Sequence, residues 1–260
     1  FSFFPDIMDQ VLNESSPQRR IALVTVAAIT PMVVMLKKKY PWNPMLGETY
    51  YTRWNNGMEA FCEQVSHHPP ETAFQVFGPN KKFTIVGVVA AGINQSVNSM
   101  VAKQEGKIKL TLKNSEVYTW EIPSIKISGL LTGKRSTSIK GTLVVKGPHL
   151  YSETTFNSKK KRKSSVYGVI KQSDGRVLMT ISGDFAGQIS IDQQPVWDVN
   201  SSKAERPLPN YFPRYSLKSD ARFRIDRSLC VLRQYDAAAK AKDVLEDLQR
   251  REEKLRSTSR

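Results

Sequence analysis

The chain has 260 residues, with 39 Lys and Arg against 24 Asp and Glu, which gives a formal net charge of +15 at pH 7. This length is enough to bury a full hydrophobic core. The basic excess favours an anionic partner such as nucleic acid, an acidic membrane or a phosphorylated small molecule. Two widely separated cysteines suit a reducing compartment better than a disulfide-stabilised secreted fold. Residues 21–36, the longest apolar run, are interrupted by polar residues and a proline and fall short of the roughly 18 residues of a membrane span. No signal peptide pattern is present, so we expect a cytosolic chain.

Helices are predicted within residues 1–36. Residues 1–13 carry apolar side chains at the spacing of one helical face, at Phe4, Ile7, Met8, Val11 and Leu12. Ser15-Ser16-Pro17 is typical of a helix start, and the residues that follow are apolar on most sides, so we expect a second, buried helix. Pro31 should break or kink that helix after Thr30.

Short strand-like runs separated by turn residues extend from about residue 48 to residue 192. Alternation is clearest in Lys107–Lys113, where every second residue is apolar, and Asn55-Asn56-Gly57 is one of several turn signals. Many successive strands without an intervening helical pattern predict an antiparallel meander closed into a β-barrel. The interior of a many-stranded barrel is too wide for side chains alone to fill, so an apolar ligand could occupy it.

Five consecutive basic residues fall within this region, at Lys159, Lys160, Lys161, Arg162 and Lys163. Such a cluster is either a solvated loop or a contact with an anionic bilayer, to which each basic residue contributes on the order of 1 kcal/mol.

Residues 195–260 read as an irregular, proline-punctuated segment followed by a helix. The helix is predicted over Asp236–Arg256, which is rich in Ala, Lys, Glu, Leu and Arg and contains no Gly or Pro. On it Lys242, Glu246 and Arg250 recur every four residues and share a face. By itself this is an ordinary exposed ion-pair ladder, worth about 0.2 to 0.5 kcal/mol per pair.

Two of the three histidines, His67 and His68, are adjacent and are followed by Pro69 and Pro70. The prolines force an extended backbone at His68. A rigid segment that displays two imidazoles and the Ser66 hydroxyl can bind an anion. The alternative is a tight turn in which the histidines are only polar cover.

Three stretches resemble motifs of the oxysterol-binding-protein-related lipid transfer proteins. They are Glu-Gln-Val-Ser-His-His-Pro-Pro at 63–70, Asn-Pro-x-Leu-Gly-Glu at 43–48 and the arginine-rich segment 219–227, in which Ala221 stands where the family has serine. The resemblance implies one ligand-binding domain over residues 1–260, built as a near-complete antiparallel β-barrel around a lipid tunnel, with helices at its N-terminal and C-terminal ends.

For the site, the resemblance implies that Arg250, His67 and His68 hold the phosphate of phosphatidylinositol 4-phosphate. Lys242 and Glu246 would bind its inositol hydroxyls, and Asn43 its glycerol or headgroup side. The family lysine three residues before this asparagine is replaced by Tyr40. Either Lys39 supplies the ammonium one residue early, or the headgroup contact is lost.

The implied mechanism is exchange without a covalent step, cofactor or metal. The phosphoinositide competes for the tunnel with a second lipid, a sterol or another lipid such as phosphatidylserine. We expect a monomer that works at the periphery of membranes or membrane contact sites. No N-terminal lid is apparent, and because the sequence starts at Phe1 without Met, we expect the lid and other upstream sequence before it.

Other functions stay open. A sterol or lipid carrier that does not bind phosphatidylinositol 4-phosphate would fit the Tyr40 replacement. A hydrolase or metal site at Glu63, His67 and His68 lacks further ligands, because only Cys62 precedes the pair and the remaining histidine, His149, lies in a separate turn. Nucleic-acid binding is not expected, since the basic cluster at 159–163 contains no aromatic residue.

Overall fold

A computed structural model describes residues 4–35, 44–133, 136–156, 164–201 and 217–258. The predicted N-terminal helices are present as α1 (Phe4–Asn13), α2 (Pro17–Ile29) and the short α3 (Met32–Met35). Ser16 caps α2, because its hydroxyl accepts the Arg19 N–H at 3.4 Å. As predicted, α2 starts at Pro17 and ends before Pro31, whose ring cannot continue the hydrogen-bond pattern.

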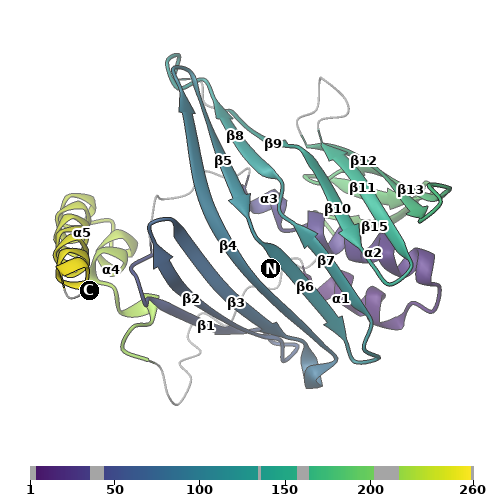
Figure 1. Ribbon diagram of the computed structural model, residues 1–260, viewed down its shortest axis with the longest axis horizontal. Helices are drawn as coiled ribbons and strands as arrows, with labels where there is room; N and C mark the ends of the chain where they lie inside the picture. The colour runs from purple at the N-terminus through teal and green to yellow at the C-terminus, as the bar shows by residue number, and fades with distance from the viewer. Residues whose placement is uncertain (1–3, 36–43, 134–135, 157–163, 202–216, 259–260) are drawn as a thin grey trace.

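The predicted antiparallel meander is a single 15-stranded antiparallel sheet (Figure 1). Its strands are β1 (Thr49–Arg53), β2 (Glu59–His67), β3 (Pro70–Phe77), β4 (Phe83–Ser96), β5 (Ser99–Glu105), β6 (Lys107–Leu112), β7 (Val117–Glu121), β8 (Ser124–Ser128), β9 (Ser136–Lys140), β10 (Thr142–Lys146), β11 (Leu150–Phe156), β12 (Ser165–Gln172), β13 (Val177–Asp184), β14 (Gln188–Ile191) and β15 (Gln194–Asp198). A short 3₁₀ turn, η1 (Pro79–Lys81), connects β3 to β4.

The sheet reaches one strand further than predicted. The sheet was predicted to end at about residue 192, but Gln194–Asp198 forms β15. Asp192 and Gln193 join it to β14 with φ angles of +45° and +67°. Two positive φ angles are typical of the tight hairpin turns that match strand twist. Because this turn lacks the usual glycine, it carries no clear hairpin signal in the sequence.

The sheet is open in the described residues, so its strands form the near-complete barrel that was expected from the family resemblance and not the closed barrel that the strand pattern predicted. The main order runs from β1 through β2, β3, β4, β6, β7 and β10 to β15, and β1 and β15 do not pair. The outer edge of β1 is already occupied, since Thr49 N–H donates to Ser219 O at 2.9 Å and Tyr51 N–H to the Asp220 carboxylate at 3.3 Å. An edge strand whose donors are satisfied by a local segment has no free ladder for β15 to join.

Helix α2 lies inside the curve of the second half of the sheet, in contact with β7 and β10 to β13 (Figure 1). Nine of its residues are buried, which explains why its sequence is apolar on nearly every side. A polar contact with the sheet is buried too, where Thr25 Oγ1 and Ser152 Oγ lie 2.7 Å apart. In this half of the sheet a helix therefore occupies the interior that was predicted to accept an apolar ligand.

The C-terminal region consists of the 3₁₀ turn η2 (Ala221–Phe223) and the helices α4 (Ile225–Val231) and α5 (Tyr235–Thr258). Helix α5 matches the helix predicted over 236–256 to within two residues at either end. It lies beside the β1 and β2 end of the sheet, away from α1 and α2 (Figure 1). None of the helices that the structure describes has the length and apolarity needed to cross a bilayer.

Candidate functional site

The histidines lie at the tip of the β2–β3 hairpin, just after a β-bulge at Val65. The side chain of Gln64, which is 2% exposed, stabilises this bulge from the buried side of the hairpin. Its Nε2 donates to the Ser66 carbonyl at 2.7 Å, and its Oε1 accepts from the Thr72 hydroxyl at 2.6 Å. A bulge re-aims the side chains that follow it. Gln64 thus positions the histidines, a role that its place in the 63–70 motif did not reveal.

The two imidazole rings pack edge to face, with centroids 4.7 Å apart, and the His68–Pro69 peptide bond is cis. His68 is exposed, whereas Nδ1 of His67 is buried and has no hydrogen-bond partner among the described residues. Burial lowers the pKa of His67 below its ordinary 6.5, and the neighbouring His68 lowers that pKa further. Both effects therefore disfavour the protonated form of His67.

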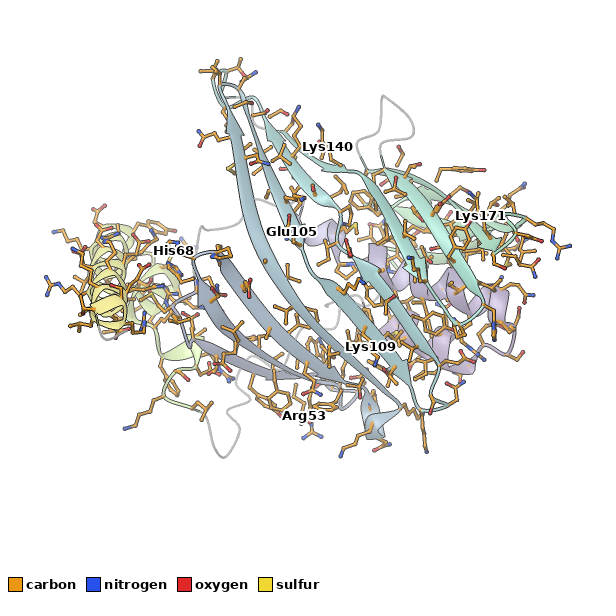
Figure 2. The ribbon with its side chains drawn as sticks, viewed as in Figure 1. Arg53, His68, Glu105, Lys109, Lys140 and Lys171 are labelled. Carbon is orange, nitrogen blue, oxygen red and sulfur yellow. The ribbon has the colours of Figure 1, made fainter. Side chains whose placement is uncertain are left out.

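Helix α5 lies beside this hairpin, at the end of the sheet where His68 is labelled (Figure 2). The Nε2 atom of His68 lies 3.9 Å from Oε2 of Glu253. The charges of Glu253 and Glu246 act to raise the pKa of His67, without outweighing its burial. Lys242 joins the group through Glu246, with Nζ and Oε1 2.6 Å apart. The structure thus brings four predicted residues together, His67, His68, Lys242 and Glu246, and adds Glu253, which was not predicted from the sequence.

Arg250 is not brought to the histidines. Its guanidinium pairs with the Asp247 carboxylate on the exposed side of α5. Each step of four residues rotates by about 40° around a helix, so Arg250 lies about 80° from Lys242 and closer to Asp247. The remaining predicted contacts, Asn43, Lys39 and the basic run 159–163, lie outside the described residues, as does Tyr40.

An ion-pair network joins the 43–48 motif to the C-terminal segment. Arg224 donates from Nη1 to Oε2 of Glu48 at 2.8 Å and from Nη2 to Oδ2 of Asp226 at 2.6 Å. Asp226 is fully buried, and Glu48 also accepts the Met45 N–H at 2.9 Å. Gly47, with φ at +76°, permits the tight turn that brings Glu48 there. Residues from two distant motifs therefore lock the base of α4 and α5 to the loop before β1.

A second pair secures the same junction at β1. The Asp220 carboxylate accepts hydrogen bonds from Arg222 N, Nε and Nη2 and from the Tyr51 N–H. Burial acts to raise the pKa of Asp220, but the bonds from Arg222 outweigh it and hold that pKa below its ordinary 3.8. The segment 219–227 therefore acts as a structural clasp, a role that was not predicted for it.

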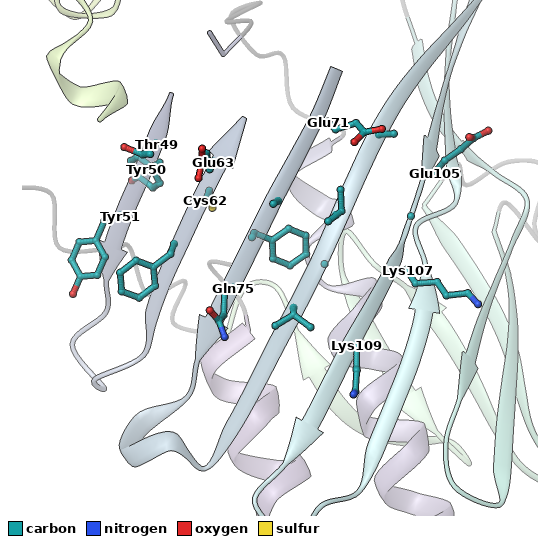
Figure 3. A pocket seen from close by; sticks show the side chains of 18 of the residues that line it. Thr49, Tyr50, Tyr51, Cys62, Glu63, Glu71, Gln75, Glu105, Lys107 and Lys109 are labelled. Carbon is teal, nitrogen blue, oxygen red and sulfur yellow. The ribbon is translucent and has the colours of Figure 1, made fainter. Parts of the chain in front are cut away.

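A cavity of about 1230 Å³ forms an open groove on β1 to β6 (Figure 3). It lies on the sheet face opposite α1. The residues that project from this face, such as Phe61, Val86 and Val88, are partly exposed, whereas their neighbours Ala60 and Ile85 are buried on the helix side. The groove is thus not the interior tunnel that was predicted.

On the helix-facing side, β4 and β5 carry an unsatisfied polar group. Gln104 opposes Ala91 in register, so it projects from the same face as Ile85. Its Oε1 is buried and has no hydrogen-bond partner among the described residues. Buried acceptors in folded proteins are nearly always satisfied, so this atom marks a place where a polar group of a ligand would fit.

Comparison with known proteins agrees with the motifs. The family profile described as oxysterol-binding protein matches residues 2–260. The chain belongs to the oxysterol-binding protein family. Oxysterol-binding protein 10 of Dictyostelium discoideum is 26% identical over 97% of the chain and 69% of its own length. Oxysterol-binding protein homolog 7 of Saccharomyces cerevisiae is 30% identical over 69% of the chain, and the chain spans less than half of that relative, 45%.

Solved structures share the fold. The Osh3 ORD in complex with PI(4)P from Saccharomyces cerevisiae superposes with a TM-score of 0.83 at 21% identity, covering 98% of this chain and 76% of that one. The Osh1 ORD domain in complex with ergosterol gives a TM-score of 0.81 at 22% identity, covering 98% and 71%. The large antiparallel sheet with helices at both ends is therefore the architecture of this family.

Proposed function

We propose that this chain is a lipid-binding and lipid-transfer protein that extracts a phosphoinositide, phosphatidylinositol 4-phosphate, and exchanges it for a sterol or another lipid such as phosphatidylserine. One observation carries the proposal. On a rigid hairpin, His68 lies 3.9 Å from Glu253 of α5, and the charge of Glu246, which pairs with Lys242, acts on His67. The Nδ1 atom of His67 is buried without a partner among the described residues. Buried polar groups without partners are rare, and this one sits among groups suited to a phosphorylated polyol.

The chemistry of the cluster supports an anionic headgroup. Because the protonated form of His67 is disfavoured when the site is empty, an arriving phosphate would raise its pKa and gain a charge-assisted hydrogen bond, worth roughly 1.5 to 3 kcal/mol. Lys242 donates without acceptor capacity, while Glu246 accepts hydrogen bonds from hydroxyl groups and keeps the ammonium in place. Arg250 can join by leaving Asp247, since an exposed ion pair contributes only about 0 to 1 kcal/mol. The four predicted contacts and Arg250 thus divide between phosphate and hydroxyls.

The second lipid is supported by the inner side of the sheet. Gln104 offers an unsatisfied acceptor to a hydroxyl, and Val89 of the neighbouring strand lies on the same face. Burial of an apolar lipid body contributes about 0.8 kcal/mol per methylene, so a sterol or acyl chain would supply most of the binding free energy. The related Osh1 and Osh3 domains, solved with ergosterol and PI(4)P, support both ligands for this chain.

The proposal also covers how the protein associates with membranes and whether the free protein is a monomer. A chain of net charge +15 is attracted to an anionic bilayer, where the run 159–163 would add contacts. We propose peripheral binding by a cytoplasmic monomer at membranes or their contact sites. Flotation with and without phosphatidylserine in the vesicles measures the first point, and light scattering of the free protein the second. Vesicle binding that ignores phosphatidylserine would contradict the electrostatic part.

The decisive experiment is extraction of labelled phosphatidylinositol 4-phosphate from liposomes. Wild type is compared with a His67→Ala/His68→Ala double variant and with His149→Ala, which removes the third histidine outside the site. Capture that collapses only in the double variant supports the headgroup site. Capture that survives in the double variant would refute it.

The alternative carrier without phosphoinositide binding rests on Tyr40. It predicts that wild type extracts a sterol but no phosphatidylinositol 4-phosphate, and that Tyr40→Lys gains phosphoinositide capture. Phosphoinositide capture by wild type that Tyr40→Lys leaves unchanged would exclude this alternative.

A further inference from the structure

Helix α5 buries only two of its 24 residues, Ala238 and Gln249. A buried alanine on a surface helix is ordinary, whereas a buried glutamine needs hydrogen-bond partners for its amide. Gln249 is 5% exposed, and its Nε2 has no partner among the described residues. The neighbouring ion pairs of α5 leave this donor unused.

The position of Gln249 on α5 places it in the headgroup cluster. At 100° per residue, Lys242, Glu246, Gln249 and Glu253 fall within a sector of about 60° of the helix. Glu253 on this sector lies 3.9 Å from His68, and Glu246 and Glu253 both act on His67. Gln249 lies between those two glutamates on the side of the helix that meets the hairpin.

Two buried groups with unused hydrogen-bonding capacity therefore flank one site from two elements, Nδ1 of His67 on β2 and Nε2 of Gln249 on α5. The other groups of the cluster lie near protein partners, since Lys242 pairs with Glu246 and Nε2 of His68 lies 3.9 Å from Oε2 of Glu253. A ligand oxygen placed between β2 and α5 would complete these two groups, which have no partner among the described residues.

We propose that Gln249 is a specificity-determining residue of the headgroup site, whose Nε2 donates a hydrogen bond to a phosphate or hydroxyl oxygen of an inositol phosphate. This role rests on the proposed function and deepens it. A neutral amide donor complements the cationic groups, because it binds a headgroup oxygen without attracting every anion equally. Lipids whose headgroups lack an oxygen at that point would leave the amide unsatisfied.

The test uses the full chain and liposomes of phosphatidylcholine with phosphatidylinositol 4-phosphate. Gln249→Met keeps the length of the side chain and removes the donor, so we expect affinity for the phosphoinositide to fall about tenfold. Gln249→Glu keeps the shape and places a carboxylate at the headgroup, so we expect a larger loss. Gln234→Met, an exposed glutamine just before α5, is the matched control and should leave capture unchanged.

Sterol extraction and circular dichroism are measured on the same samples. Loss of phosphoinositide capture with intact sterol capture supports the assignment, because a merely structural role would reduce both. Should Gln249→Met fail to fold, Gln249→Glu decides alone. Phosphoinositide capture by a folded variant that equals wild type would overturn the role of Gln249 and leave the proposed function standing. No capture by wild type itself would overturn the proposed function and this role with it.

Discussion

Arg224→Met should weaken the attachment of α4 and α5 to the sheet more than any other single change at the junction. The guanidinium donates to Asp226, which is fully buried, and to Glu48, which is almost buried. Removing one partner of a buried ion pair costs about 3 to 5 kcal/mol, because the remaining charge stays buried without compensation. In a chain of this size each kcal/mol lowers Tm by about 2 to 4 °C. We therefore expect Tm to fall by roughly 6 to 20 °C.

The assay is thermal unfolding followed by circular dichroism, with hydrogen exchange to locate the loss in α4 and α5. Arg233→Met, at an exposed position after α4, is the matched control. The double variant Arg224→Met/Asp226→Leu should recover part of the loss, since apolar replacement of a whole buried pair is often neutral. A Tm change below about 2 °C for Arg224→Met, with unchanged exchange in α5, would refute the network as the anchor of this helix.

Three more experiments test the pKa shifts and the backbone geometry. Because the pKa of His67 is lowered, binding of an anion should require protonation of its ring. Phosphoinositide affinity should therefore rise as the pH falls from about 8 to about 6. Extraction that does not change over this pH range would contradict this reasoning. The carboxylate of Asp220, whose pKa Arg222 holds below its ordinary value, stabilises the fold above about pH 3.9 and loses that contribution as the pH falls through its folded-state pKa. Denaturation below about pH 4 should therefore show a steeper loss of Tm in wild type than in Asp220→Asn. Gly106→Ala should destabilise by about 3 kcal/mol or more, because φ is +133° and a Cβ would overlap the Val88 carbonyl oxygen; near-native stability in urea would count against so close an approach of Gly106 to β4.

The N-terminal helices show what composition and periodicity can and cannot predict. The apolar spacing in α1 and the Ser-Pro start of α2 were enough to predict both helices, and the apolarity of α2 on most sides indicated its burial. Nothing in the local pattern indicated that β10 to β13 provide that burial. Contacts between segments more than a hundred residues apart leave no mark on local periodicity. The sequence therefore did not indicate that α2 fills the interior of the sheet along β10 to β13.

The cluster of the histidine hairpin and α5 was predictable only in part for a related reason. The histidine hairpin and α5 lie about 180 residues apart, and only the resemblance to a family joined them. The prediction took every fourth residue of α5, from Lys242 to Glu246 and Arg250. The face toward the hairpin instead carries Lys242, Glu246, Gln249 and Glu253, at steps of four, three and four residues. That mixed spacing is the true helical repeat, and it would have identified Gln249 as well.

The two faces of the sheet explain why the groove on its outer face was not predicted. In β6 lysines alternate with buried apolar residues, so one face is clearly wet. In β4 both faces are apolar, because Ile85 is buried against the helices while Val86 and Val88 are 38% and 45% exposed. Alternation cannot assign a side to a strand that is apolar on both. A sheet with this pattern buries one face against its helices and leaves the other as the wall of a groove, and only the position of α1 and α2 decides which face is which.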